Sequence, residues 1–119
     1  MKNELINRTK RFALDCWNFC FKVPKSREYN AFVNQLIRSS SSVGANYRAS
    51  QRAKSTADFI NKLKIVEEEA DESVYWLEIF EEILPKHSQE IEVLKKEGSE
   101  LLAITVASIN TAKRNQNKK

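Results

Sequence analysis

His87, Cys16 and Cys20 are the side chains that could support nucleophilic catalysis, and His87 is the single histidine of the chain. A Cys/His or Ser/His pair needs a base within hydrogen-bond reach of the nucleophile. His87 follows Pro85 in an expected turn, far along the chain from both cysteines. A disulfide between cysteines four residues apart on one helix is awkward, and a metal site would need more ligands. We expect two buried, reduced cysteines and no metal site.

The sequence also lacks the residues that other catalytic arrangements need. A di-iron bundle needs Glu-x-x-His on two helices, and a phosphate-binding loop needs more glycines than Gly44 and Gly98. The carboxylates between residues 67 and 82 could bind a divalent ion, but a solvated acidic face is far more usual. The sequence therefore predicts a protein that is not an enzyme and has no cofactor.

Charge is unevenly distributed along the chain. Residues 1–64 hold 13 basic and 4 acidic side chains, residues 65–112 hold 3 and 12, and the whole chain carries +4. The basic half could bind phosphates of RNA or DNA, or it could pair with the acidic half within the protein or between subunits. The candidate phosphate contacts lie near the turn between the second and third helices: Arg48, Arg52, Lys54 and Lys62.

Four other polar residues have an expected structural role. Arg38 could pair with Glu69 or Glu72 of the next helix, although it could instead contact a phosphate. Asn46 lies eight residues after Arg38, so both lie close to one face of a helix. We expect Asn46 to bridge two helices through hydrogen bonds.

Helical periodicity predicts the elements that position these residues. Hydrophobic residues make up 41% of 119 residues, and glycine and proline together number only four, which argues against a turn-rich β fold. Apolar residues recur every three or four positions in four segments, and no apolar run is long enough to span a membrane. The expected helices are 4–23, 27–53, 56–84 and 88–113, followed by a frayed basic tail over 113–119.

Caps and prolines divide these segments. Ser26 and Ser55 suit N-caps, and Pro24 and Pro85 end the helices before them. The run Ser39–Ser42 is typical of a loop, but the apolar spacing stays in phase across it, so we expect a continuous helix. The sequence thus predicts an all-α, antiparallel up-down-up-down four-helix bundle in a single domain over 1–119.

The third helix carries apolar residues away from its core stripe. A bundle helix in a monomer needs only one apolar face. These residues could be absorbed by a wide core contact, or they could form a subunit interface, which we favour. They are Ile65, Tyr75, Trp76, Ile79 and Ile83.

A distinctive run extends from Gln35 to Arg48 and reads Gln-Leu-Ile-Arg-Ser-Ser-Ser-Ser-Val-Gly-Ala-Asn-Tyr-Arg. Together with Asp58-Phe59-Ile60, Glu69-Ala70, Glu72-Ser73 and Tyr75-Trp76-Leu77, it resembles the four-helix-bundle family of 23S rRNA intervening-sequence proteins over residues 8–112. Where the family often has Asn-Ile-Ala-Glu-Gly, this chain has Asn-Tyr-Arg-Ala-Ser at 46–50. A role tied to that glutamate is therefore not transferred.

The resemblance implies a bundle that assembles into a ring, in related members a pentamer. It also implies a relation to the accessory protein of diversity-generating retroelements, a similar basic bundle that binds nucleic acid. We therefore expect a cytoplasmic, non-catalytic homo-oligomer that binds structured RNA or DNA through a basic surface and does not act at a membrane. The alternative is a scaffold whose ring recruits a protein partner.

Overall fold

Four long α-helices account for most of residues 2–118, the part of the chain that the computed structural model describes. They are α1 (Lys2–Cys20), α2 (Arg27–Ser50), α3 (Thr56–Ile83) and α4 (Ser88–Asn117), with a short 3₁₀ helix, η1 (Pro85–His87), before α4. Met1 and Lys119 lie outside the described residues.

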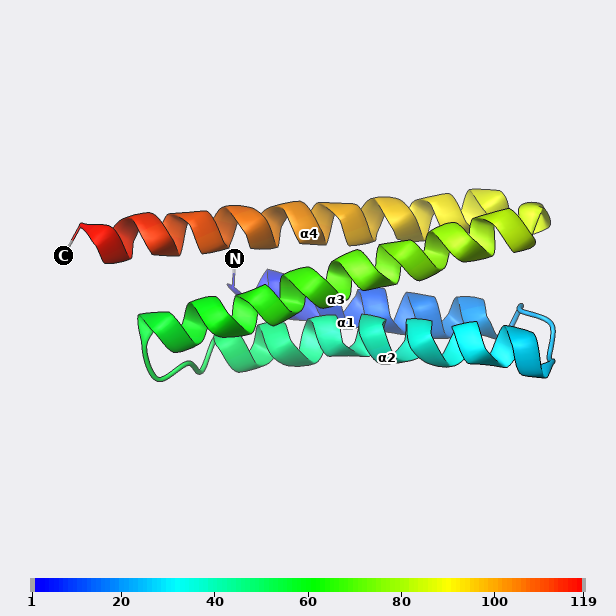
Figure 1. Cartoon of the computed structure of the whole chain (residues 1–119), viewed down its shortest axis with the longest axis horizontal. Helices are drawn as coiled ribbons and strands as arrows, with labels where there is room; N and C mark the ends of the chain where they lie inside the picture. The colour runs from blue at the N-terminus through cyan, green and yellow to red at the C-terminus, as the bar shows by residue number, and fades with distance from the viewer. Residues whose placement is uncertain (1, 119) are drawn as a thin grey trace.

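The helices form an elongated bundle of 53 × 22 × 21 Å, in which successive helices run in opposite directions (Figure 1). α2 packs against α1 and α3, and α4 packs against α3 and more sparsely against α1. The α2–α3 turn and the C-terminus share one end of the bundle, and the other two turns share the opposite end. The all-helical bundle predicted from periodicity is confirmed.

Serine side chains cap two of the helices, as predicted. The Ser26 hydroxyl accepts a hydrogen bond from the backbone N–H of Tyr29 at 3.1 Å. Ser55 accepts one from the N–H of Asp58 at 3.0 Å, and the Asp58 carboxylate accepts one from the N–H of Lys54. These bonds satisfy donors that a helix N-terminus leaves free, and they fix where α2 and α3 begin.

Three helix C-termini lie three or four residues from the predicted positions, and the other helix ends lie within two residues. α1 ends at Cys20 instead of 23, in keeping with the tendency of the residue before a proline to avoid helical geometry. Hydrogen-bonded turns follow, and Val23 is buried in the core. α2 ends at Ser50 instead of 53. α4 continues to Asn117, so the expectation of a frayed tail from 113 is wrong. Ala112 packs against the core, and cations near a helix C-terminus favour the helix dipole.

The serine run lies inside α2 without a break. Ser39 and Ser40 are fully buried, and each hydroxyl donates to a backbone carbonyl one turn earlier. The Ser39 hydroxyl also lies 2.9 Å from that of Ser73 on α3. These small side chains let α2 approach its neighbours closely while every buried hydroxyl keeps a partner.

Buried residues recur every three or four positions on each of the four helices, as the apolar periodicity predicts. Phe12, Phe19 and Phe80 are among the largest fully buried side chains. Near the end of α4, Ile109 is buried whereas its neighbour Ser108 is only half-buried. The stripe steps by four residues from 101 to 105 to 109, which keeps the larger apolar side chain inside.

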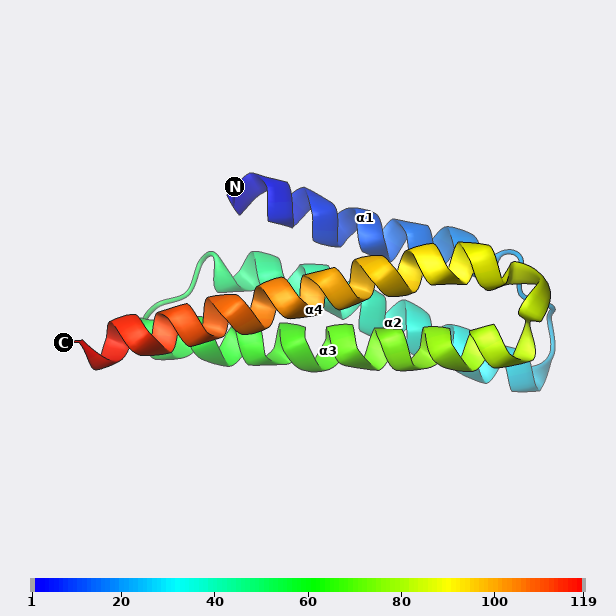
Figure 2. The same ribbon diagram turned by 90° about the horizontal axis from the view of Figure 1, so that it is seen from above.

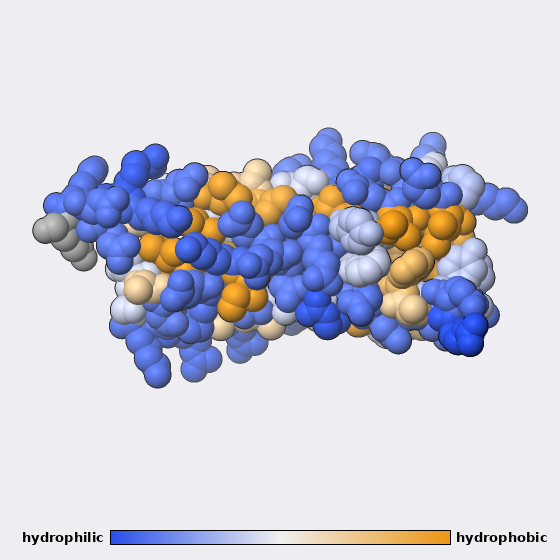
Figure 3. Space-filling model, viewed as in Figure 1, coloured by the Kyte–Doolittle hydropathy of each residue, from blue (hydrophilic) through white to orange (hydrophobic). Residues whose placement is uncertain are grey.

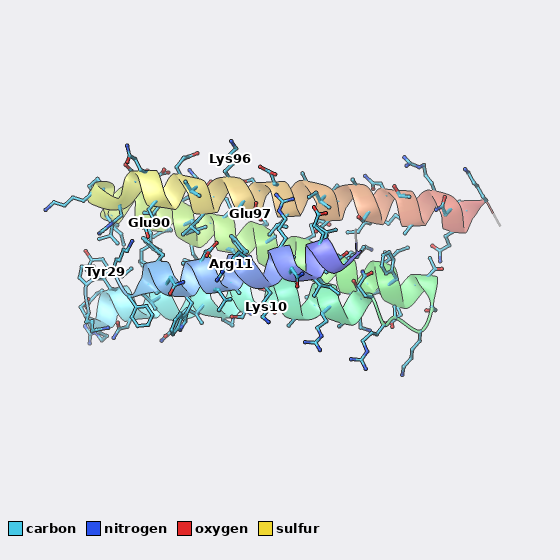
Figure 4. The ribbon with its side chains drawn as sticks, turned by 180° about the vertical axis from the view of Figure 1, so that it is seen from behind. Lys10, Arg11, Tyr29, Glu90, Lys96 and Glu97 are labelled. Atoms are coloured by element: carbon cyan, nitrogen blue, oxygen red, sulfur yellow. The ribbon has the colours of Figure 1, made fainter. Side chains whose placement is uncertain are left out.

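Ion pairs join α1 to α4 where apolar packing is sparse. The Arg8 guanidinium donates to both carboxylate oxygens of Glu97 at 2.7 and 2.8 Å, and to Glu100 at 2.7 Å. Lys22 donates to Glu90 near the other end of α1. Figure 2 shows α1 diverging from α4 toward its N-terminus, and Figure 4 shows Glu90 and Glu97 on the side of α4 that faces α1. The two links hold the least embedded helix in place.

Candidate nucleic-acid interface and association surfaces

Exposed cations gather at the end of the bundle that carries the α2–α3 turn. Arg48 lies in the last turn of α2, and Arg52 and Lys54 lie in the turn. The last turns of α4 bring further basic residues to the same end (Figure 1). We call this set the basic end: Arg48, Arg52, Lys54, Lys113, Arg114 and Lys118.

The side chains of the basic end pair with no carboxylate of residues 2–118. All six side chains are exposed, and none forms an ion pair with another residue among those described. Arg114 makes only a hydrogen bond of 3.3 Å to the Thr111 hydroxyl. Unneutralised cations on one surface attract phosphates.

Lys62 differs from the other three candidates for phosphate contact. Its side chain is half-buried, and its ammonium group donates to the Asp58 carboxylate at 2.6 Å. This hydrogen bond and the one from the Lys54 N–H hold the pKa of Asp58 below its ordinary value. Lys62 is therefore less available to a phosphate than the other three candidates, because its ammonium group already pairs with a carboxylate.

A hollow of about 450 Å³ with a mixed polar and apolar lining opens beside these cations. It lies between the α2–α3 turn and the end of α4, and Phe59 forms an apolar part of its wall. Lys54 borders it together with three hydroxyl and three amide residues, which could hydrogen-bond to phosphate or sugar oxygens. These are Ser50, Ser55, Thr56, Gln51, Asn115 and Gln116.

Arg38 links α2 to α3 in the middle of the bundle, away from the basic end. Its guanidinium donates to the two oxygens of Glu69 at 3.1 and 3.2 Å and to Glu72 at 2.7 Å. The Trp76 indole N–H donates to the same Glu72 oxygen, and with Arg38 it lowers the pKa of Glu72. Arg38 is thus part of a network that links the two helices.

Asn46 does not bridge two helices as expected. Its amide donates to the Ser42 carbonyl and hydroxyl, one turn earlier in α2. The hydroxyls of Ser39 and Ser73 make a buried polar contact between α2 and α3, in addition to the exposed Arg38 network.

The five candidate interface residues of α3 divide into two groups. Ile65, Tyr75 and Ile83 are exposed, with exposed fractions of 40%, 51% and 39%. Trp76 and Ile79 are half-buried, and the Trp76 ring lies 5.5 Å from that of Phe32 on α2. The core contact therefore covers Trp76 and Ile79 in part and leaves the other three residues at the surface. On the face seen in Figure 3, hydrophobic surface is confined to areas separated by hydrophilic side chains.

A second exposed apolar surface lies on α1, and the sequence reasoning missed it. Trp17 and Phe21 are 48% and 62% exposed, and their rings pack edge to face 4.5 Å apart. Leu14 lies beside them at 40%. The signal was present, because Leu14, Trp17 and Phe21 recur at spacings of three and four away from the core stripe.

The thiols are poor nucleophiles. Both cysteines are free, and burial raises the pKa of each, for Cys20 to about 11. The His87 imidazole lies 3.9 Å from the Glu90 carboxylate. Within residues 2–118, no group of three His, Cys, Asp or Glu side chains is placed to hold a metal ion. No helix in this range is long and apolar enough to cross a membrane.

Comparison with known proteins identifies the family. The family model described as 23S rRNA-intervening sequence protein matches residues 1–107. The chain belongs to this family. A similar solved structure is that of a protein with unknown function from the S23 ribosomal protein family of Bacteroides thetaiotaomicron. It is 30% identical with a TM-score of 0.82, and the match covers 92% of this chain and 99% of that one. No curated protein sequence matches.

Proposed function

We propose that this protein is a non-catalytic, self-associating helical bundle that binds structured RNA or DNA through its basic end. The observation that carries the proposal is the gathering of six exposed cations at one end of the bundle, none of them in an ion pair within residues 2–118. The end of α2 and the α2–α3 turn supply three of them, and the end of α4 supplies the other three, so cations distant in sequence lie at the same end of the bundle.

The chemistry of this end suits a phosphate backbone. Lysine and arginine side chains neutralise phosphates and release bound counterions, which supplies most of the sequence-independent affinity. The hydroxyls and amides of the adjacent hollow add hydrogen-bond partners that could fix the position of the backbone. The raised pKa values of both thiols support a role without covalent catalysis, and free cysteines fit a reducing cytoplasm.

The exposed apolar residues of α1 and α3 support the proposal that the protein self-associates. Soluble monomers seldom expose large contiguous apolar areas, whereas this chain exposes Trp17 and Phe21 on α1 and Ile65, Tyr75 and Ile83 on α3.

The test combines a triple substitution with a matched control. The test variant carries Arg48→Ala, Arg52→Ala and Lys54→Ala. The control carries Arg27→Ala, Lys86→Ala and Lys96→Ala, which remove the same charge from exposed positions outside the basic end. Fluorescence anisotropy measures binding to structured 23S ribosomal RNA fragments and to a DNA duplex, titrated with salt.

We expect the slope of log K against log salt to become shallower by about 2–3 in the test variant, since each lost phosphate contact contributes about 0.7–0.9. The control should stay close to the unsubstituted protein. Equal binding by the test and control variants would refute the assignment to the basic end. No binding of either probe by the unsubstituted protein at low salt would refute the nucleic-acid function and favour a scaffold that recruits a protein.

A further inference from the structure

Two adjoining hollows lie where the end of α4 packs against the beginning of α3. The first, of about 450 Å³, opens beside the basic end, and a second of about 500 Å³ lies next to it between α3 and α4. Phe59, Ala112 and Asn115 border both, so the two hollows meet at the Phe59 ring. Phosphate contacts alone give no role to this ring or to the second hollow.

The residue types on α4 explain why this space is left open. The positions that line the second hollow recur every three or four residues beside the core stripe of α4, and most carry short side chains. They are Ile104, Ala107, Ser108, Thr111, Ala112 and Asn115. Short side chains cover Phe59 thinly, so its ring is half-buried although it packs against the core. Figure 3 shows hydrophobic surface between α3 and α4 in the half of the molecule that holds the C-terminus.

Charge is arranged around these hollows and not inside them. Lys54 borders the first hollow, and the residues that line the second are all uncharged. Lys113 and Arg114 lie in α4 between Ala112 and Asn115 and are exposed. A nucleic acid whose phosphates contact these cations would therefore have its bases within reach of an uncharged, partly aromatic surface.

We propose that the two hollows receive an unpaired base of the nucleic acid bound at the basic end, and that this base stacks on Phe59. A nucleobase has flat apolar faces, which stack on aromatic side chains, and polar edges, which hydrogen-bond. The amides of Gln51, Asn115 and Gln116 can both donate to and accept from such edges. The volumes fall within the range of about 300–1,000 Å³ that holds small organic ligands.

This inference rests on the proposed function and specifies its substrate class. The bases of a duplex are paired and stacked on one another, so they cannot enter a side pocket without leaving the helix. Bases in loops, bulges and single strands are free to do so. The basic end should therefore prefer unpaired nucleotides to a duplex of the same charge.

Three DNA probes of equal length separate base contacts from phosphate contacts. They are a strand without internal pairing, the same strand with abasic sites in place of its bases, and the strand annealed to its complement. The abasic strand keeps the phosphates and removes the bases, so the ratio of the two single-strand affinities measures the base contact. The test variant is Phe59→Leu, which keeps apolar bulk but has no aromatic face. Tyr29→Leu is the matched control, because Tyr29 is a half-buried aromatic residue at the opposite end of the bundle (Figure 4).

We expect the unsubstituted protein and Tyr29→Leu to bind the strand about 5- to 150-fold more tightly than the abasic strand in fluorescence anisotropy, the effect of stacking one base. Phe59→Leu should bring this ratio close to one. Its affinity for the abasic strand and its slope of log K against log salt should stay unchanged, because no cation is lost.

The inference and the proposed function fail differently. No binding to any of the three probes at low salt would overturn both. Equal binding of the strand and the abasic strand by the unsubstituted protein, or an unchanged ratio in Phe59→Leu, would overturn only the base contact. Circular dichroism establishes that each variant is helical. If Phe59→Leu loses helicity, Ala112→Leu replaces it, since it narrows both hollows without a change of charge and should remove the same preference.

Discussion

Gly44 and Gly98 both lie inside helices, yet replacing each with alanine should change stability in opposite directions. Gly98 of α4 is buried, and a Cβ there would lie 3.0 Å from the Val74 Cγ2 atom and 3.2 Å from the Phe12 ring. At Gly44 of α2, the nearest atoms belong to Thr9 at 3.4 Å, an ordinary van der Waals distance.

Two free-energy terms decide the sign. Alanine is favoured over glycine inside a helix by about 0.8–1.0 kcal/mol, and this term is the same at both positions. At Gly44 little opposes it, so we expect a gain of about 0.5–1 kcal/mol. At Gly98 the Phe12 ring is 1% exposed and would have to shift within the packed core to admit a Cβ 3.2 Å away. Overpacking costs about 1–3 kcal/mol, so Gly98→Ala should lose up to about 2 kcal/mol.

Urea unfolding followed by circular dichroism measures the difference. With a slope of about 1–3 kcal/mol per molar urea, each kcal/mol moves the midpoint by about 0.3–1 M. Protein concentration is held constant, because association stabilises the folded state by mass action. Ala107→Gly, at an exposed position of α4, calibrates the helix-propensity term. A Gly98→Ala variant as stable as Gly44→Ala would refute the close packing of α4 against Phe12.

Two further predictions concern the polar links between helices. Because the indole of Trp76 and the guanidinium of Arg38 lower the pKa of Glu72 from its ordinary 4.5, its stabilisation is present at neutral pH and is lost as the pH falls below that value. Glu72→Gln should be less stable than the unsubstituted protein at pH 7, and its free energy of unfolding in urea titrations should fall less between pH 5 and pH 3. An equal fall in both proteins would contradict this. Arg8→Met removes the bidentate pair with Glu97, and it should cost about 0.5–1.5 kcal/mol and speed amide hydrogen exchange in α1 more than in α2. Equal protection of α1 in both proteins would show that the pair does not hold the helix.

The ease of predicting an ion pair depends on how many turns separate its partners. Arg38 and Glu69 are 31 residues apart, on helices joined by one short turn, so the sequence alone suggests their pairing. Arg8 and Glu97 are 89 residues apart, and three intervening turns must be placed before their register is known. The prediction that Asn46 bridges two helices was wrong for a local reason. Its short side chain reaches the Ser42 carbonyl in its own helix before it reaches a neighbouring helix.

Apolar periodicity predicted the helices well because core stripes repeat over many turns, whereas surfaces depend on what the neighbouring helices cover. The α1 surface shows this limit. Leu14, Trp17 and Phe21 recur at helical spacing beside the core stripe of α1, but only the structure shows that α2 and α4 leave that side of α1 uncovered. On α3, by contrast, part of the predicted interface is covered within the bundle, because the Phe32 ring of α2 packs against Trp76.

The antiparallel course of the helices turns a distribution along the sequence into a distribution in space. The α2–α3 turn and the end of α4 are distant in sequence, but an even number of helices brings them to the same end (Figure 1). Because α4 remains helical to Asn117, Lys113 and Arg114 lie at that end on a helix. The exposed apolar residues on which self-association is proposed lie on α1 and α3, outside the basic end. Self-association would therefore leave most of each basic end free, and every added copy would contribute another set of cations to the same nucleic acid. Affinity for long RNA or DNA should then rise with assembly through effective concentration, without any new contact in the single chain.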